Sequence, residues 1–482
     1  MSQSTHAFLK FSIILTGLAI GAIVGLLAGI KPLLLGVGIC AIVPLTFFFS
    51  NFELSILGLL VLRSSLDPFS KQQLPAAFAL GVDVLAILYV VVQLLTRQPI
   101  KIDRFWWFLI GWMVLQGLWV VLLPLGGLGL DGSALPMALR EWIRMFSWSM
   151  VYFLVMQLKD RVPPEKVINT LFLALIIPVL IGLLQQFVPS VLPPLLSASG
   201  EDFGAIADGK VRIRSTLGGA NTFSTFLLLY IGLTWWRLER AINRLPWLLL
   251  LVTLAFLMVQ TKTLVSLMMM SVFIGVMIVP RLSFLSLIGG FVLFALMIVF
   301  FGSTEFGQQR LGEIGNTPLL NRDIDLWRAI LLSQGDGNSF NWRLAYWTQL
   351  LNSWQYHPIL GYGLGLTIIV GGGTYFAHND FVRALVEGGI IGFLTFLIFL
   401  GAQSGRLLYL MRSSLATHSQ RNLCNVLFAF SIAIPVGMLT ENIWTHTTLF
   451  FYWWTLVALA GWNWAELHSA DASKEFPALD AN

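Results

Sequence analysis

The chain has 482 residues, of which 57% are hydrophobic and 11% are charged. Soluble globular proteins carry about 25% charged residues, so this composition excludes a soluble enzyme, a nucleic-acid-binding domain and a disordered scaffold. The net charge is +5, but in a membrane protein the distribution of cations is more informative than their sum. Cys40 and Cys424 both lie inside apolar runs, which predicts neither a disulfide framework nor a cysteine metal site. We therefore expect an all-α, multi-pass membrane protein.

Apolar runs long enough to cross a membrane follow one another along the chain. A helical span needs about 20 apolar residues, because the hydrocarbon core is about 30 Å thick and a helix rises about 1.5 Å per residue. Runs near this length lie at 11–30, 32–49, 76–95, 105–123, 139–158, 167–188, 222–236, 245–261, 263–279, 282–301, 385–403, 423–440 and 447–464. A shorter run at 52–62 makes fourteen candidates. Two of the weaker runs are candidates for re-entrant or merged segments, so we expect 12–14 spans.

The cations predict the orientation of these spans. With the N-terminus in the cytoplasm, most lysines and arginines fall in cytoplasmic loops, as the positive-inside rule requires. Both termini are then cytoplasmic, and the segments 189–221 and 302–384 lie outside. The predicted organisation is N-terminal helices over 1–301, a large external loop over 302–384, three last spans over 385–464 and a cytoplasmic tail over 465–482. A helix at 341–355 is expected to lie at the membrane interface, and loops this long are usually functional.

Three cations of the first external loop, Lys210, Arg212 and Arg214, come just before the span at 222–236. The two arginines alternate, so in an extended stretch they face the same way. One interpretation is a solvated loop that pairs with its own acidic residues. The other is a clamp for a phosphorylated ligand, because guanidinium groups bind phosphate bidentately. The glycines that follow and Asn221 suit a turn that opens a helix, whose N-terminus also favours an anion.

Other charges lie in or beside predicted spans. Lys262 separates two apolar runs on the outer side, where snorkelling at the interface is the ordinary explanation. Arg140 and Arg144 enter the span at 139–158 and either line a cavity or snorkel. Asp83 lies well inside its span, so it is a functional candidate by default, unless it pairs with one of these two arginines.

The most structured cluster lies at 342–392. Arg343 and Trp347 are spaced to share one helix face. His378 precedes Asn379 and Asp380, either of which can cap the next helix. On that helix, Arg383 and Glu387 are spaced as an i,i+4 ion pair.

His378 is the candidate for chemistry in this cluster. A lone histidine is more often structural, but an outward-facing histidine beside arginines suits general-base attack on a phosphate-linked donor. A zinc site with His357 and His446 has no matching ligand spacing, so we expect no metal.

These residues resemble the O-antigen ligase and O-antigen polymerase superfamily, the polytopic glycosyltransferases of the bacterial envelope. The matching pattern consists of Arg343, Trp347, Pro358, Gly361, Gly363, Gly365, His378, Asn379, Arg383, Glu387, Gly389 and Gly392. The segment RIRSTLGGAN, which ends at Asn221, is similar to the arginine-containing loop of that family. Many spans with one large late external loop, followed by three more, resemble the family over nearly the whole chain.

The resemblance implies transfer of a glycan from a polyprenyl-diphosphate carrier to the hydroxyl of a glycan or lipid-anchored acceptor. The reaction would take place on the periplasmic side of the bacterial inner membrane, with no cofactor, nucleotide sugar or metal. His378 would be the catalytic base, and Arg212 or Arg214 would bind the donor diphosphate together with Arg343. Lys262 stands where the family often has an arginine, and it supplies the charge without the bidentate fork.

The alternative is a membrane transporter of a small anion such as bicarbonate. External cations, an intramembrane Asp83 and many spans favour it. However, the best-organised motif lies in an external loop and not at broken mid-membrane helices. A flippase for lipid-linked glycans is a third possibility, and ligase, polymerase and protein-directed transferase share the same motif.

Overall fold

The computed structural model describes residues 43–122, 134–197, 206–207, 210–278, 317–321, 323–335, 339–372 and 376–464, with the single positions 283, 289, 299 and 303. The predicted span at 11–30 and the tail at 465–482 lie outside the described residues, as does most of the runs at 32–49 and 282–301. The chain forms two units, Met1–Leu59 and Leu60–Asn482. In the described part of the first, the ring of Phe48 packs edge-on against those of Phe49 and Phe52.

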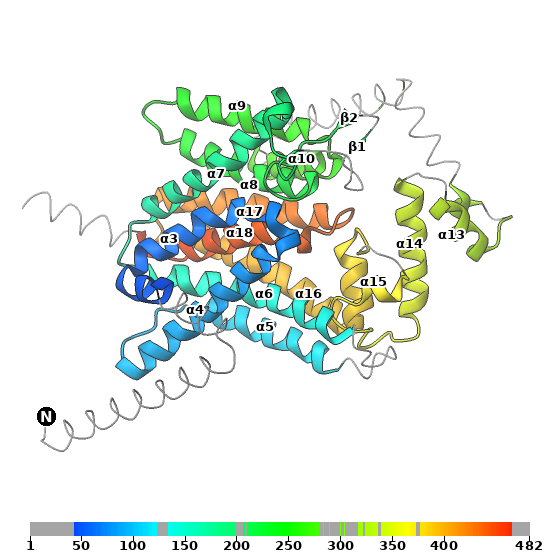
Figure 1. Cartoon of the computed structure of the whole chain (residues 1–482), viewed down its shortest axis with the longest axis horizontal. Helices are drawn as coiled ribbons and strands as arrows, with labels where there is room; N and C mark the ends of the chain where they lie inside the picture. The colour runs from blue at the N-terminus through cyan, green and yellow to red at the C-terminus, as the bar shows by residue number, and fades with distance from the viewer. Residues whose placement is uncertain are drawn as a thin grey trace, which may run out of the picture. The chain divides into compact units, whose positions relative to one another are not determined.

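The first half of the described chain is almost entirely helical (Figure 1). Its helices are α3 (Phe52–Leu62), α4 (Leu74–Thr96), α5 (Arg104–Val121), α6 (Ala134–Gln157), α7 (Pro164–Phe187), α8 (Ala220–Leu238), α9 (Leu245–Gln260) and α10 (Leu264–Ile278). The short 3-10 helices are η1 (Arg63–Ser65), η2 (Asp67–Gln72) and η4 (Pro189–Val191). Strands β1 (Ile206–Ala207) and β2 (Lys210–Val211) form an antiparallel ribbon in the loop before α8.

The second half of the described chain contains the external-loop helices and the last three long helices. Its elements are η6 (Pro318–Leu320), α13 (Leu326–Gly335), α14 (Ser339–Trp354), α15 (Thr367–Val370), α16 (Asp380–Arg412), α17 (His418–Met438), η7 (Ile443–Thr445) and α18 (Thr447–Ala460). The helix expected at 341–355 is confirmed as α14. The span expected at 385–403 is part of a longer helix, α16, which begins earlier because Asn379 caps it.

Five described helices are long and apolar enough to cross a membrane, namely α4, α5, α7, α16 and α17. A sixth candidate is the helix at 43–50 together with the helical segment 52–65, which meet at 117° as a broken span or a re-entrant loop. Helices α9, α10 and α18 are apolar but shorter. The expectation of an all-α, multi-pass membrane protein is therefore confirmed in its outline, while the number of 12–14 spans stays a prediction.

The core of the larger unit is built from helices that are enclosed by protein. Helix α6 packs against α4, α5 and α18, and α17 packs against α10 and α16. Residues 147–157 of α6 and residues 448–460 of α18 are buried along their whole length. Helices enclosed on all sides need no outward apolar stripe. The charged residues of α6, namely Arg140, Glu141 and Arg144, all precede this enclosed stretch.

Helix α16 is broken at Gly389, whose φ is +62° and whose ψ is −163°. The carbonyl groups of residues 386 and 387 accept hydrogen bonds from the N–H groups of Tyr362 and Gly363, at 3.0 and 2.9 Å. Beyond the break, the N–H of Ile390 donates to the carbonyl of Pro358 at 2.9 Å. The glycine-rich turn thus pairs with backbone groups that the broken helix leaves open.

The break requires glycine for two reasons. A positive φ is strained for other residues. In addition, a Cβ at Gly389 would lie 2.3 Å from the carbonyl carbon and oxygen of Ile359. The facing Gly361, with φ +67°, would place a Cβ 2.5 Å from the backbone nitrogen of Gly389. The pattern of glycines in the sequence is therefore a requirement for close backbone contact.

Replacing this glycine is expected to lower stability sharply. Gly389→Ala forces a strained φ and a backbone clash, for which we expect a loss of about 2 kcal/mol or more in free energy of unfolding. Gly401→Ala in the same helix is the matched control, because its Cβ meets nothing within 4 Å. The thermal midpoint of the detergent-solubilised protein measures both. Equal midpoints for the two variants would contradict this account of the break.

Candidate functional site

His378 lies in the turn that leads into α16. Its backbone is in the left-handed region, with φ +49°. The turn is held on both sides, because Trp347 Nε1 donates to the carbonyl of Ala377 and Asn379 Oδ1 accepts from the N–H groups of residues 381 and 382. The imidazole packs edge-on against the ring of Trp342, with centroids 5.7 Å apart. Its side chain is 25% exposed, so it is positioned by the protein and still accessible.

Glu441 faces the imidazole from the segment between α17 and η7. Its Oε1 lies 3.2 Å from Nδ1 of His378. Oε1 also accepts from the N–H of Asn442 at 3.1 Å, and Oε2 accepts from Nδ2 of Asn221. A carboxylate beside Nδ1 favours the tautomer that carries its proton there. The lone pair of Nε2 is then available to accept a proton.

Arg212 and Arg343 bring positive charge to the same place. Arg212 Nη2 donates to Oδ1 of Asn221 at 3.3 Å, and its Nε donates to the carbonyl of Thr261 at 3.0 Å. Burial lowers the pKa of Arg212 from its ordinary value, Glu441 opposes this, and the positive charge of Arg343 on α14 adds to the decrease. Two guanidinium groups from distant parts of the chain therefore lie within electrostatic range of one another. We call His378, Glu441, Asn221, Arg212 and Arg343 the His378 cluster.

Burial and neighbouring charges also shift the pKa values of one acidic and one basic group of this region, Glu441 and His446. Burial alone raises the pKa of Glu441, but the interaction with His378 and the charge of His446 outweigh it, so the pKa falls to about 2. Burial lowers the pKa of His446 to about 4, although Glu441 opposes this shift. In the ring of His446, Nδ1 lies at hydrogen-bond distance, 2.9 Å, from Oγ1 of Thr225. Glu441 is therefore charged at neutral pH and His446 is neutral.

The other cations expected near a donor phosphate lie differently. Arg214 Nη2 donates to the carbonyl of Ser197, and its N–H donates to Oε1 of Gln185, so it hydrogen-bonds with other groups than Arg212 does. Lys262 is exposed, with φ +51°. It directly follows Thr261, whose carbonyl accepts from Arg212. The side chain of Lys210 lies outside the described residues.

A second group of charges lies between α6 and α16, where Arg383, Glu141 and Glu387 are buried and Arg144 is partly buried. Arg383 donates to Oε2 of Glu141 at 2.7 Å and to Oε1 of Glu387 at 2.9 Å, which makes the predicted i,i+4 pair. Arg144 donates to the same oxygen of Glu141. Oγ1 of Thr367, at the start of α15, donates to Glu387. We call Arg383, Glu141, Glu387 and Arg144 the ion network; two positive and two negative charges balance within it.

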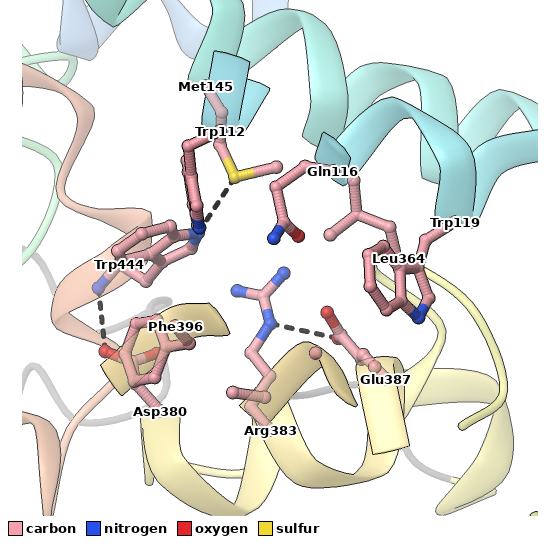
Figure 2. Close-up of a pocket in the computed structure, with 13 residues that line it drawn as sticks. Trp112, Gln116, Trp119, Met145, Leu364, Asp380, Arg383, Glu387, Phe396 and Trp444 are labelled. Carbon is pink, nitrogen blue, oxygen red and sulfur yellow. Dashed lines mark hydrogen bonds and ion pairs between the residues drawn. The ribbon is translucent and has the colours of Figure 1, made fainter. Parts of the chain in front are cut away.

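The ion network borders a cavity of about 40 Å³. Figure 2 shows Arg383 extending from α16 toward Gln116, with aromatic rings on both sides. The cavity is lined by Trp112, Gln116, Trp119, Met145, Leu364, Asp380, Arg383, Ala384, Glu387, Gly388, Gly392, Phe396 and Trp444. The mixture of aromatic walls and paired charges is typical of a rigid interior and not of an open binding cleft.

The interpretation that Asp83 pairs with Arg140 or Arg144 is wrong. Oδ2 of Asp83 accepts from Oγ of Ser147 at 2.8 Å. Arg144 turns to Glu141 instead, and Arg140 Nη2 donates to Oε1 of Gln73 at 2.9 Å. The arginines therefore separate, one entering the ion network and the other lying near the surface.

Sequence reasoning missed two carboxylates of these clusters, Glu441 and Glu141. Glu441 is the lone acidic residue of a short loop between two apolar runs on the predicted outer side, and that position was a usable signal. Glu141 stands between Arg140 and Arg144 in the sequence, and only the fold shows that it faces Arg383. Among the described residues, no three His, Cys, Asp or Glu side chains form a group that could hold a metal ion.

Residues 245–397 match the family model described as O-antigen ligase. The match covers less than half of the chain, but it contains Lys262, Arg343, His378, Arg383 and Glu387. No curated protein matches the chain. The comparison thus supports the expected resemblance to the O-antigen ligase superfamily, while the roles expected for His378 and the residues around it stay predictions.

The pKa shifts predict acid sensitivity of the segment 441–446. Because the pKa of folded His446 is about 4, below its unfolded value of about 6.5, its neutral form stabilises the fold fully above pH 6.5. This contribution is lost as the pH falls from 6.5 to 4. Folded Glu441 has a pKa of about 2, below the unfolded pKa of about 4.3 for glutamate. Its charged form therefore also stabilises the fold, and this stability is lost as the pH falls from 4.3 to 2.

The variant His446→Gln keeps a polar partner for Thr225 and removes the titration. We expect its thermal midpoint to change less than that of the wild type between pH 6.5 and 4. His418→Gln, at the exposed start of α17, is the control and should keep the wild-type slope. Identical slopes for His446→Gln and the wild type would refute the assignment.

Proposed function

We propose, because residues 245–397 match the O-antigen ligase family model, that the chain is a metal-independent glycosyltransferase of the bacterial inner membrane. Its donor is a glycan on a polyprenyl-diphosphate carrier, and its acceptor is a sugar hydroxyl at the periplasmic face. The observation that supports this best is the convergence of Arg212, Arg343 and the His378–Glu441 pair from four separate segments of the chain.

The two arginines suit the leaving group. When the bond between the anomeric carbon and the diphosphate oxygen breaks, negative charge grows on the diphosphate. Guanidinium groups placed in advance stabilise that charge without reorganisation, and they bind phosphate oxygens with paired N–H donors. Arg212 is already oriented by Thr261 and Asn221, and the exposed Lys262 adds a third cation beside it.

The histidine suits the nucleophile. Nε2 of His378 accepts the proton of the acceptor hydroxyl as its oxygen attacks the anomeric carbon. The imidazolium formed in this step lies 3.2 Å from the Glu441 carboxylate, which stabilises the new positive charge and holds the ring. One displacement of this kind inverts the anomeric configuration. The polyprenyl diphosphate leaves with the bonding electron pair and remains in the membrane lipids.

Loss of His378 is expected to remove transfer. With a purified lipid-linked donor in liposomes and EDTA present, His378→Ala should lower kcat by about 10²–10⁴-fold, the usual contribution of a general base. His418→Ala is the matched control, since that histidine begins α17 on the predicted cytoplasmic side. Full activity of His378→Ala would overturn the mechanism.

Loss of Arg212 is expected to weaken use of the donor. Charge-assisted hydrogen bonds to phosphate contribute about 1.5–3 kcal/mol, so Arg212→Gln should lower kcat/KM for the donor by about 10–100-fold. Arg212→Lys should lie between, because lysine keeps the charge and loses the fork. Arg240→Gln, which breaks an ion pair with Glu165, should leave donor kinetics unchanged. An Arg212→Gln variant with wild-type kinetics would rule out a diphosphate contact.

A ligase and a polymerase differ in the acceptor to which they transfer the glycan. A strain from which the gene for this protein is deleted distinguishes the two activities. On a surface-glycan gel, loss of the long ladder with one repeat left on the anchor indicates a polymerase. Free lipid-linked polymer with a bare anchor indicates a ligase.

A further inference from the structure

A buried carboxylate, Asp380, lies next to the His378 cluster and has no part in the proposed chemistry. It is the first residue of α16, and 2% of its surface is exposed. Its Oδ2 accepts a hydrogen bond from the backbone N–H of Trp444 at 2.8 Å. Within the described part of the chain its Oδ1 has no hydrogen-bond partner. Figure 2 shows the contact at the edge of the cavity, between α16 and the segment that contains Trp444.

This hydrogen bond connects the two segments that supply the His378–Glu441 pair. Asp380 comes two residues after His378, and Trp444 comes three residues after Glu441. One segment leads into α16 and the other follows α17, so no short stretch of chain joins them. The 2.8 Å bond therefore limits how far the imidazole and the carboxylate can move apart.

The Trp444 end of the bond is held firmly by the core. Its ring packs edge-on against Trp148 and Trp112, with centroids 4.9 and 5.6 Å apart. Its Nε1 donates to the sulfur of Met145 at 3.3 Å. Because the backbone at Trp444 is fixed in this way, its N–H is a rigid point of attachment for the start of α16.

Burying the aspartate side chain at this position costs free energy. A buried carboxylate is costly unless it is paired and fully hydrogen-bonded. The nearby Arg383 acts on Asp380 through its charge, but its ion pairs are with Glu141 and Glu387, and none joins it to Asp380 among the described residues. A buried polar group that is only partly satisfied calls for an explanation beyond stability.

We propose that Asp380 is a positioning residue, which holds His378 and Glu441 at their working distance through the N–H of Trp444. The proposal rests on the function proposed above. Asp380 affects the geometry of the catalytic base and not the binding of the donor, because Arg212 and Arg343 come from other segments of the chain. Its loss should therefore lower kcat and leave the KM for the donor nearly unchanged.

Three variants test the proposal in the liposome transfer assay, each measured per mole of monodisperse protein. Asp380→Ala removes the acceptor, and a misplacement of about 1 Å can cost about 100-fold, so we expect kcat to fall by about 10–100-fold with KM within about twofold. Asp380→Asn keeps an oxygen for Trp444 and should retain kcat within about threefold. Asp325→Ala is the matched control. It also removes a carboxylate that accepts a backbone N–H bond, from Trp327 at the start of α13, and it should keep the wild-type kcat.

The outcomes separate this proposal from the function on which it rests. Wild-type transfer, loss in His378→Ala and wild-type kcat in folded Asp380→Ala would overturn the positioning role alone. An Asp380→Asn variant as slow as Asp380→Ala would also overturn it, because the hydrogen bond would not be what matters. No transfer by the wild type from a lipid-linked donor would overturn both proposals.

Discussion

A guanidinium group buried in an apolar interior has to be matched by carboxylates, and the arrangement of this protein around His378 depends on how Arg383 is matched. Arg383 is 3% exposed and lies between Glu141 and Glu387. An unpaired charge there would cost several kcal/mol, so the two carboxylates have little freedom to move. Glu141 belongs to α6 and Glu387 to α16, and the pairing therefore locks two helices together. The same Glu387 binds Thr367, which adds the end of the glycine-rich turn to the locked group.

The glycines make this matching possible. At Gly365 a Cβ would lie 2.6 Å from Cγ of Glu141, so any larger residue would push the carboxylate away from Arg383. At Gly389 the helix breaks and its open backbone groups pair with the turn at 358–363. The turn, the break and the ion network form one rigid support at the start of α16. His378 lies in the turn directly before this rigid part of α16, on a backbone held by Trp347 and Asn379.

Much of this arrangement was predictable from residue spacing, because the contacts are local in sequence. The i,i+4 spacing of Arg383 and Glu387 predicted their pairing, the Asn-Asp sequence predicted a capped helix start, and the pattern around Trp347 predicted α14. The contacts that were not predictable join residues far apart in the chain. Glu441 meets His378, and Glu141 meets Arg383, only after α6, α16 and α17 have packed.

Asp83 is a case in which residue spacing predicted the wrong partner. A buried aspartate and two arginines in a neighbouring helix suggested an ion pair. Arg144 instead binds Glu141, which Arg383 also binds, and Asp83 accepts a hydrogen bond from the hydroxyl of Ser147. Which carboxylate forms an ion pair with a given arginine depends on how the packed helices are rotated relative to one another. No pattern within one helix contains that information.

The ion network and the His378 cluster differ in what remains for a ligand. In the ion network, charges of opposite sign are paired with one another and mostly buried, so adding a charged ligand would break existing pairs. In the His378 cluster, Arg212 and Arg343 repel one another, and Glu441 faces His378 and acts on Arg212 through its charge. The imidazole of that cluster is partly exposed, and the diphosphate of the proposed donor would bring negative charge between the two arginines. The paired network therefore accounts for rigidity, while the chemistry proposed above belongs to the accessible His378 cluster.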